Sequence, residues 1–355
     1  MGRGRRRVVL ALIGLALAAA GCGDGDGGDA ADDTGWIVGL LDRIPDSAEP
    51  FGEVMVVDLP SAATAAGMAV PGSGAPDEVI ADYFLGMPRD ALIPDLLRDP
   101  APDFADLTAD LGIDPNQVFL AITAGTPPET YQVLEGDFDA AAIDAAVRSD
   151  PIWSSLLSTA EHRGVTYYAW GDDFEVDTSR VTPVRPVGRG GRLGLDDGFL
   201  CWVPWTAGME GLIDAGADAV ATLADDPVLG RVARALEEAG VYSAILTDTP
   251  LLDDGTASGR GLGVGGGRDE AGPFWVIVAV HDTATAAEES AAAVRSILTE
   301  GTISSTGDEW AQRVSGFEVT VEGDMLVVIA HAAAGEGDWM RAYYTRELLL
   351  VAAQG

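Results

Sequence analysis

The stretches FWVIVAVHD, residues 274–282, and YQVLEGDFD, residues 131–139, share one pattern. In each, a strand pattern of β-branched and aromatic residues ends in an aspartate and leads into an alanine-rich helix pattern that closes with AAVRS. The aspartates, Asp139 and Asp282, suit the N-cap position, where a carboxylate accepts hydrogen bonds from first-turn amides. For the second helix, Thr285 and Glu288 offer a capping box instead.

The similarity continues after each helix. A strand that starts with glycine follows, at 164–168 and at 316–320, and an acidic turn and an apolar strand come next. Four elements in one order predict an internal duplication, with a first unit over 37–239 and a second unit over 240–355. Strand, helix and hairpin in each unit predict an α+β fold: duplicated units of antiparallel or mixed sheet with helices packed on one face.

Hydrophobic periodicity along the whole chain gives the expected elements. Strands are predicted at 54–59, 118–123, 131–135, 164–170, 199–203, 241–247, 274–280, 317–321 and 325–330. Helices are predicted at 77–85, 104–111, 140–149, 209–223, 228–239, 285–300 and 338–353.

The series of strand, Gly-Asp-Phe-Asp at 136–139, helix and Gly-Val-x-Tyr-Tyr at 164–168 resembles a group of uncharacterised envelope lipoproteins and secreted proteins from high-GC bacteria. The resemblance spans residues 105–250. It implies an envelope setting and no particular activity.

The N-terminus has the layout of a signal peptide over residues 1–21. Four arginines precede an apolar run from Val8 to Ala20, and small residues follow. The run is shorter than the roughly 20 apolar residues that a membrane-spanning helix requires. Arg5, Arg6 and Arg7 leave both general secretion and twin-arginine export open.

Ala19-Ala20-Gly21-Cys22 resembles the lipobox of bacterial lipoproteins, with Ala19 in place of the commoner leucine. The resemblance implies cleavage between Gly21 and Cys22 and a diacylglycerol group on the Cys22 sulfur. The protein would then lie on the extracytoplasmic face of the cell membrane. In an ordinary secretory signal, by contrast, Cys22 would be incidental. Residues 22–36 are rich in glycine and aspartate and predict a flexible acidic tether.

Charge excludes several function classes. The chain of 355 residues carries a formal charge of −36, and loss of the four signal-peptide arginines leaves 17 bases against 57 acids, or −40. Such a chain repels phosphate backbones, so we expect no nucleic-acid partner. Every basic side chain is arginine. Without lysine there is no Walker phosphate loop, Schiff base or Ser-x-x-Lys nucleophile.

The sequence predicts no catalytic residue, metal site or cofactor. Cys201 lies in an apolar run and is interpreted as a buried strand cysteine, and it cannot pair with a lipidated Cys22. His162, His281 and His331 lack metal-ligand spacing and are interpreted as partly exposed edge residues. A hydrolase site assembled from distant residues around one of these histidines stays an alternative.

Four other features are interpreted as structural rather than functional. Gly259–Arg268 is rich in glycine but precedes a predicted strand, so it is interpreted as a mobile loop or hairpin connection rather than a phosphate loop. Arg185, Arg189 and Arg192 are interpreted as a solvated turn, with an anion contact as the alternative. The pairs Asp172-Asp173 and Asp253-Asp254 are assigned to turns. Core packing is the interpretation for four tryptophans, with an apolar ligand groove as the alternative: Trp153, Trp170, Trp202 and Trp205.

Together these features predict a lipid-anchored envelope protein with a non-catalytic structural or ligand-binding role. The expected partners are the membrane, reached through the anchor, and a small hydrophobic ligand or an envelope protein. A carrier of lipid or another hydrophobic ligand is the alternative. It requires an apolar cavity between sheet and helices.

Overall fold

The computed structural model describes residues 35–46, 51–72, 74–98, 104–185, 187–196, 198–248, 259–303, 306–333 and 339–344. These residues belong to one compact unit, Thr34–Gly355. Several predicted features lie outside the described residues. They are the predicted signal peptide with Gly21, the predicted lipidation site Cys22, most of the predicted tether, and the pair Asp253-Asp254. The same holds for the end of the helix predicted at 338–353.

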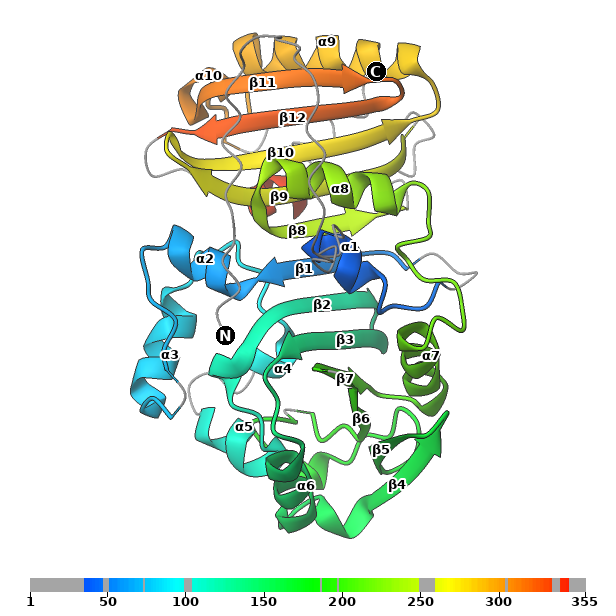
Figure 1. Cartoon of the computed structure of the whole chain (residues 1–355). Coiled ribbons are helices and arrows are strands. Elements are labelled where there is room, and N and C mark those ends of the chain that lie inside the picture. Colours follow the sequence, from blue (N-terminus) through cyan, green and yellow to red (C-terminus); the bar gives the residue numbers. More distant parts are fainter. Residues whose placement is uncertain are drawn as a thin grey trace, which may run out of the picture. The chain divides into compact units, whose positions relative to one another are not determined.

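A single antiparallel sheet of twelve strands organises the fold, in the order β11-β12-β10-β9-β8-β1-β2-β3-β7-β6-β5-β4 (Figure 1). The strands are β1 (Val54–Asp58), β2 (Val118–Thr126), β3 (Glu129–Gly136), β4 (Leu157–His162), β5 (Val165–Trp170), β6 (Gly191–Asp196), β7 (Phe199–Val203), β8 (Val241–Thr247), β9 (Gly259–Asp269), β10 (Gly272–His281), β11 (Val314–Glu322) and β12 (Met325–Ala332). The α+β class is thus confirmed, with an antiparallel sheet.

Helices cover both faces of this sheet. One face carries α1 (Trp36–Leu41), α7 (Thr206–Gly216) and α8 (Leu229–Ala239), which share one apolar core, and Figure 1 shows α1 and α8 in front of the strands. The other face carries α2 (Leu59–Ala65), α3 (Asp77–Gly86), α4 (Asp95–Arg98), α5 (Phe104–Leu111), α6 (Ala140–Ser149), α9 (Ala284–Glu300), α10 (Trp310–Arg313) and α11 (Trp339–Tyr344). The prediction of helices on one face is therefore wrong. The sheet requires cover on both faces because strands such as β10 are apolar on both sides, and every residue from Phe274 to His281 is buried.

All of the predicted strands are present, but three strands were missed. β4 and β6 are short and carry polar or glycine residues that hide the alternation of a strand. The third, β9, occupies the glycine-rich stretch that was interpreted as a loop. That interpretation is wrong, since β9 pairs with β8 on one side and β10 on the other.

The glycines of β9 let neighbouring groups approach the backbone closely. A Cβ on Gly263 would lie 2.4 Å from Val232 Cγ1, a side chain of α8. A Cβ on Gly266 would lie 2.2 Å from the Trp339 indole nitrogen and 2.6 Å from an Asp90 oxygen on the other face. The glycines therefore serve packing on both sides of a central strand rather than mobility.

The predicted helices α3, α5, α6, α8 and α9 are confirmed, whereas α7 starts and ends earlier than predicted. Asp139 caps α6 as expected, accepting hydrogen bonds from the amides of residues 141 and 142. The second helix differs, because Thr283 caps α9 instead of Asp282 or Thr285. The short helices α1, α2, α4 and α10 were not predicted.

The sheet continues across the predicted unit boundary at residues 239 and 240, because β8 pairs with β1. From this pair outward the strand orders are β1-β2-β3-β7-β6 and β8-β9-β10-β12-β11, and β5 and β4 extend the first. The duplication and the two units remain predictions.

Candidate functional site

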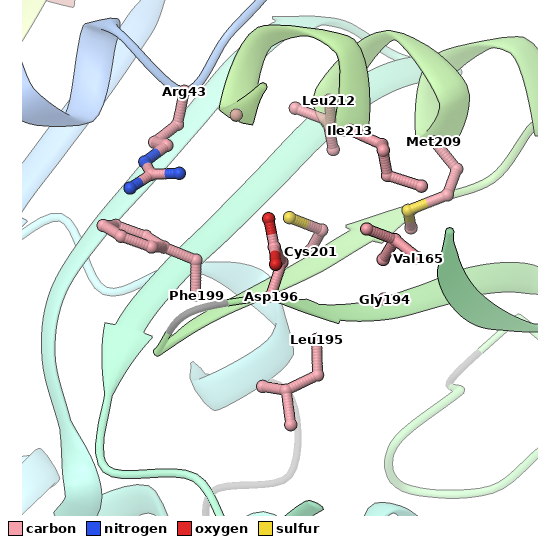
Figure 2. A pocket seen from close by; sticks show the side chains of 11 residues that line it. Arg43, Val165, Gly194, Leu195, Asp196, Phe199, Cys201, Met209, Leu212 and Ile213 are labelled. Carbon is pink, nitrogen blue, oxygen red and sulfur yellow. The ribbon is translucent and has the colours of Figure 1, made fainter. Parts of the chain in front are cut away.

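A pocket lies between α7 and the strands β5, β6 and β7 (Figure 2). Its lining residues are Arg43, Val165, Gly194, Leu195, Asp196, Phe199, Cys201, Met209, Leu212, Ile213 and Gly216. Most of these side chains are apolar, and a few polar groups accompany them. This composition is typical of small-molecule sites.

The helix α7 supplies one wall of the pocket. Met209, Leu212 and Ile213 follow the i, i+3, i+4 spacing of one helix face, and Figure 2 shows them pointing toward the sheet. Opposite them, Gly194 leaves room for the methionine, because a Cβ there would lie 2.9 Å from the Met209 sulfur. Val165 and Cys201 complete the apolar wall on the strands.

Two charged side chains accompany the apolar walls. The Arg43 guanidinium carbon lies 3.7 Å from the centre of the Phe199 ring, a cation–π contact. A Cβ on Gly216 would lie 3.2 Å from Arg43 Nη1 and 3.5 Å from Asp196 Oδ2, so both charged groups approach this glycine. The pocket thus combines an apolar wall with one hydrogen-bond donor group and one acceptor group.

Cys201 lies on β7, as predicted, and is half-buried. Burial raises the pKa of its thiol to about 12, against the opposing effect of Arg43. The thiol is therefore protonated at neutral pH and is a poor nucleophile. The sequence did not indicate that this cysteine lines a pocket, because the other wall comes from residues 206–216 of a separate helix.

The pocket is narrow. Its volume is about 340 Å³ when the adjoining open solvent is counted, and the enclosed part has room for about one water molecule. A larger ligand would displace the flexible Met209 side chain or α7. α7 is held at two points, since Asp173 accepts a 2.9 Å hydrogen bond from the Thr206 amide and Asp214 contacts His162 at 2.7 Å.

The histidines lie outside this pocket. His162 contacts Asp214, and His331 Nε2 lies 2.9 Å from Asp269. His281 is 2% exposed, and neither ring nitrogen has a hydrogen-bond partner, so its interpretation as a partly exposed residue is wrong. Among the hydrogen bonds of the described residues, none joins a serine side chain to a histidine ring.

The interpretation of the arginine cluster as a solvated turn is also wrong. Arg185 and Arg192 are 3% and 4% exposed, whereas Arg189 is half-buried. Arg192 pairs with Asp173 at 2.5 Å and donates to Thr206 Oγ1 at 3.1 Å, so it supports the start of α7. Arg185 has different surroundings, described below.

The tryptophans mostly fill cores, as predicted. Trp153 and Trp170 are each 1% exposed, while Trp205 is half-buried. Trp205 stacks on Phe174, with ring centres 5.6 Å apart, and meets Tyr131 edge-on. Asp172 and Asp173 lie in a turn, but Asp173 also anchors Thr206 and Arg192.

In the part of the chain that the structure describes, no three His, Cys, Asp or Glu side chains converge as metal ligands. Over the same residues, no helix combines the length and the apolar character that a membrane span requires.

No family model and no curated protein matches the chain. Among solved structures, the chain is similar to the Treponema protein TP0453 in three crystal forms. Crystal form I has a TM-score of 0.41 at 8% identity, over 83% of this chain and 92% of that chain. Form IV has a TM-score of 0.40 at 10% identity, over 82% and 92%. Form III has a TM-score of 0.38 at 10% identity, over 81% and 91%. Likeness at this level supports no conclusion about function.

Proposed function

We propose that this chain is an extracytoplasmic envelope protein, anchored to the membrane by lipid on Cys22, with a non-catalytic ligand-binding role. The observation that carries the proposal is the signal-peptide pattern that ends in Ala19-Ala20-Gly21-Cys22. Each buried methylene of an acyl chain contributes about 0.8 kcal/mol, so two or three chains hold a protein stably on a membrane. We also propose that the body arose by duplication of the units 37–239 and 240–355.

For the ligand-binding role, the pocket under α7 is the site that the geometry favours. Its walls suit a slender apolar group, and Arg43 and Asp196 suit a polar group next to it. The ligand class is therefore a small amphipathic molecule with an aliphatic part. A carrier of lipid is the alternative for the same site, and it requires α7 to move away from the sheet because the pocket is narrow.

Metabolic labelling with a fatty-acid analogue tests the anchor. The wild-type protein should incorporate the label, and Cys22→Ser should not. Cys201→Ser is the matched control, because these two are the only cysteines of the chain, and it should be labelled like the wild type. Persistent label on Cys22→Ser would refute lipidation at this residue.

Binding of a fluorescent fatty acid, cis-parinaric acid, tests the pocket in the detergent-solubilised full-length protein. Cys201→Phe fills the space beside Met209 and should weaken binding at least tenfold, whereas the near-isosteric Cys201→Ser should bind within about twofold of wild type. Arg43→Gln, which leaves the apolar walls intact, should weaken binding less than Cys201→Phe. Equal binding by the wild type and Cys201→Phe, with both folded by circular dichroism, would exclude this pocket.

A further inference from the structure

A second cluster, on the opposite face of the sheet from α7, surrounds Arg185. This residue lies in the connection between β5 and β6, two strands near one end of the sheet (Figure 1). Its guanidinium carbon is 4.3 Å from the ring centre of Trp170, 4.5 Å from that of Trp153 and 5.1 Å from that of Trp202. Three indole rings thus enclose one cation.

Hydrogen-bond donors in this cluster lack acceptors. Arg185 is 3% exposed, and its Nε, Nη1 and Nη2 atoms have no hydrogen-bond partner. The buried indole Nε1 of Trp170 has none either. A guanidinium carries five N–H donors and no acceptor, and an indole carries one donor. Buried donors without acceptors are costly, so this arrangement calls for an acceptor.

Two carboxylates lie close enough to Arg185 to act on its charge, but neither accepts a hydrogen bond from its guanidinium. Asp150 and Asp110 act on Arg185 electrostatically and oppose the effect of burial, which lowers the pKa of the guanidinium to about 10. Arg185 is therefore charged at neutral pH. Asp150 Oδ1 already accepts hydrogen bonds from the amides of Ile152 and Trp153, at 2.8 and 3.0 Å.

We propose that the cluster of Arg185, Trp153, Trp170 and Trp202 binds a small inorganic anion, chloride in the simplest case. An anion accepts several N–H donors and brings no hydrogen of its own. An anion also offsets the positive charge of the guanidinium, to which no carboxylate of the described residues is hydrogen-bonded. The near-complete burial of Arg185 favours a small ion over an organic ligand. The site lies apart from the pocket under α7 and does not depend on its function.

The ³⁵Cl NMR line width of chloride in a solution of the full-length protein in detergent tests the site. We expect a line width above that in detergent alone, and saturating bromide should remove this excess because it displaces chloride. Sodium gluconate, added to the same ionic strength, is the control and should leave the excess unchanged. Arg185→Gln should abolish this excess. Trp170→Phe keeps an aromatic ring, though a smaller one, and removes the indole N–H donor, so it should reduce the excess line width. This variant tests the site even if Arg185→Gln does not fold.

Arg189→Gln is the matched control, because Arg189 lies four residues away and is not among the residues of the cluster. It should leave the excess line width unchanged. Excess line width that is equal in the wild type, Trp170→Phe and Arg185→Gln would overturn the proposal. So would a wild-type line width that does not exceed that of detergent alone, which would leave water as the acceptor.

Discussion

At the residue scale, the Cys201 thiol should react slowly with maleimides. Burial raises the pKa of this thiol to about 12, so very little of it is the reactive thiolate at pH 7. We expect N-ethylmaleimide to modify folded Cys22→Ser much more slowly than the same protein in urea. Mass spectrometry over time measures both rates. Equal rates would contradict the environment described for Cys201.

His281 should make stability depend on pH. Burial lowers the pKa of this histidine in the folded protein, although Asp282 and Asp324 raise it, so the folded state binds its proton less readily than the unfolded state does. The free energy of unfolding should then fall as the pH drops below about 6.5, by at most about 1.4 kcal/mol per pH unit for one proton.

Comparison of the wild type with His281→Leu separates the contribution of His281 to the pH dependence of stability from the contributions of the many carboxylates. Urea unfolding at pH 7.5 and 5.5 should show a smaller loss of stability at pH 5.5 for the variant than for the wild type. Parallel pH profiles would show that His281 gains its proton as easily in the folded protein as in the unfolded chain.

Sequence reasoning assigned the chemistry of these residues better than their surroundings. It favoured a structural role for Cys201 over a nucleophilic one, because of the apolar run around this residue. It could not place Met209 opposite that cysteine or enclose Arg185 with three tryptophans, because Trp153, Trp170 and Trp202 meet only when the sheet forms. The burial of His281 was missed for the same reason.

At the element scale, the glycines of β9 fix how closely α8 packs. Gly263→Val should destabilise the protein by about 1–3 kcal/mol, because the added Cβ would overlap Val232 although valine favours strands. Urea unfolding measures the change.

Gly259→Val in the same strand is the control. Among the described residues, the nearest atom to a Cβ there is Val280 O at 3.8 Å, an ordinary contact, so the effect should stay within about 0.5 kcal/mol. Equal destabilisation by both variants would indicate that strand geometry in general, rather than contact with α8, requires the glycines.

The first helix of the body is held by a carboxylate from another element. Glu237 on α8 accepts hydrogen bonds from the Ile37 amide and, at 3.1 Å, from the Val38 amide. Gly35 permits this approach, since a Cβ there would overlap the carboxylate. Glu237→Ala leaves two helix N-terminal amides without an acceptor and should cost about 1–3 kcal/mol.

Hydrogen exchange at Leu40 and Leu41 measures how firmly α1 stays docked. Protection there should fall in Glu237→Ala and remain in Glu238→Ala, which alters an exposed side chain on the same helix. Unchanged protection in Glu237→Ala would mean that apolar contacts of α1 alone hold the helix.

Helices and strands with a strong hydrophobic periodicity were predictable from the sequence. Those that depend on contacts with distant parts of the chain were not. The β-branched run of β10 and the amphipathic pattern of α8 are readable locally. β9 contains too few side chains to show a strand period, and α1 has only six residues and takes its capping group from Glu237, far along the chain.

At the scale of the whole molecule, the α+β class follows from alternating strand and helix patterns, but the placement of helices does not. Strands such as β10 and β8 are apolar on both faces, which indicates that helices cover both faces of the sheet. The prediction of helices on one face was drawn from the duplicated pattern and did not take this apolar character into account. The pairing of β1 with β8, which makes one sheet of both halves, depends on contacts between residues about 190 positions apart.

The proposed lipid anchor matters most for the whole molecule, because it would place a strongly acidic body outside the cell. Intact-mass analysis of the N-terminal peptide, from protein extracted from its own membranes, tests it most directly. We expect a peptide that begins at Cys22 with a diacylglycerol thioether on the sulfur. A peptide with an unmodified Cys22 thiol, or one that retains residues 1–21, would contradict it.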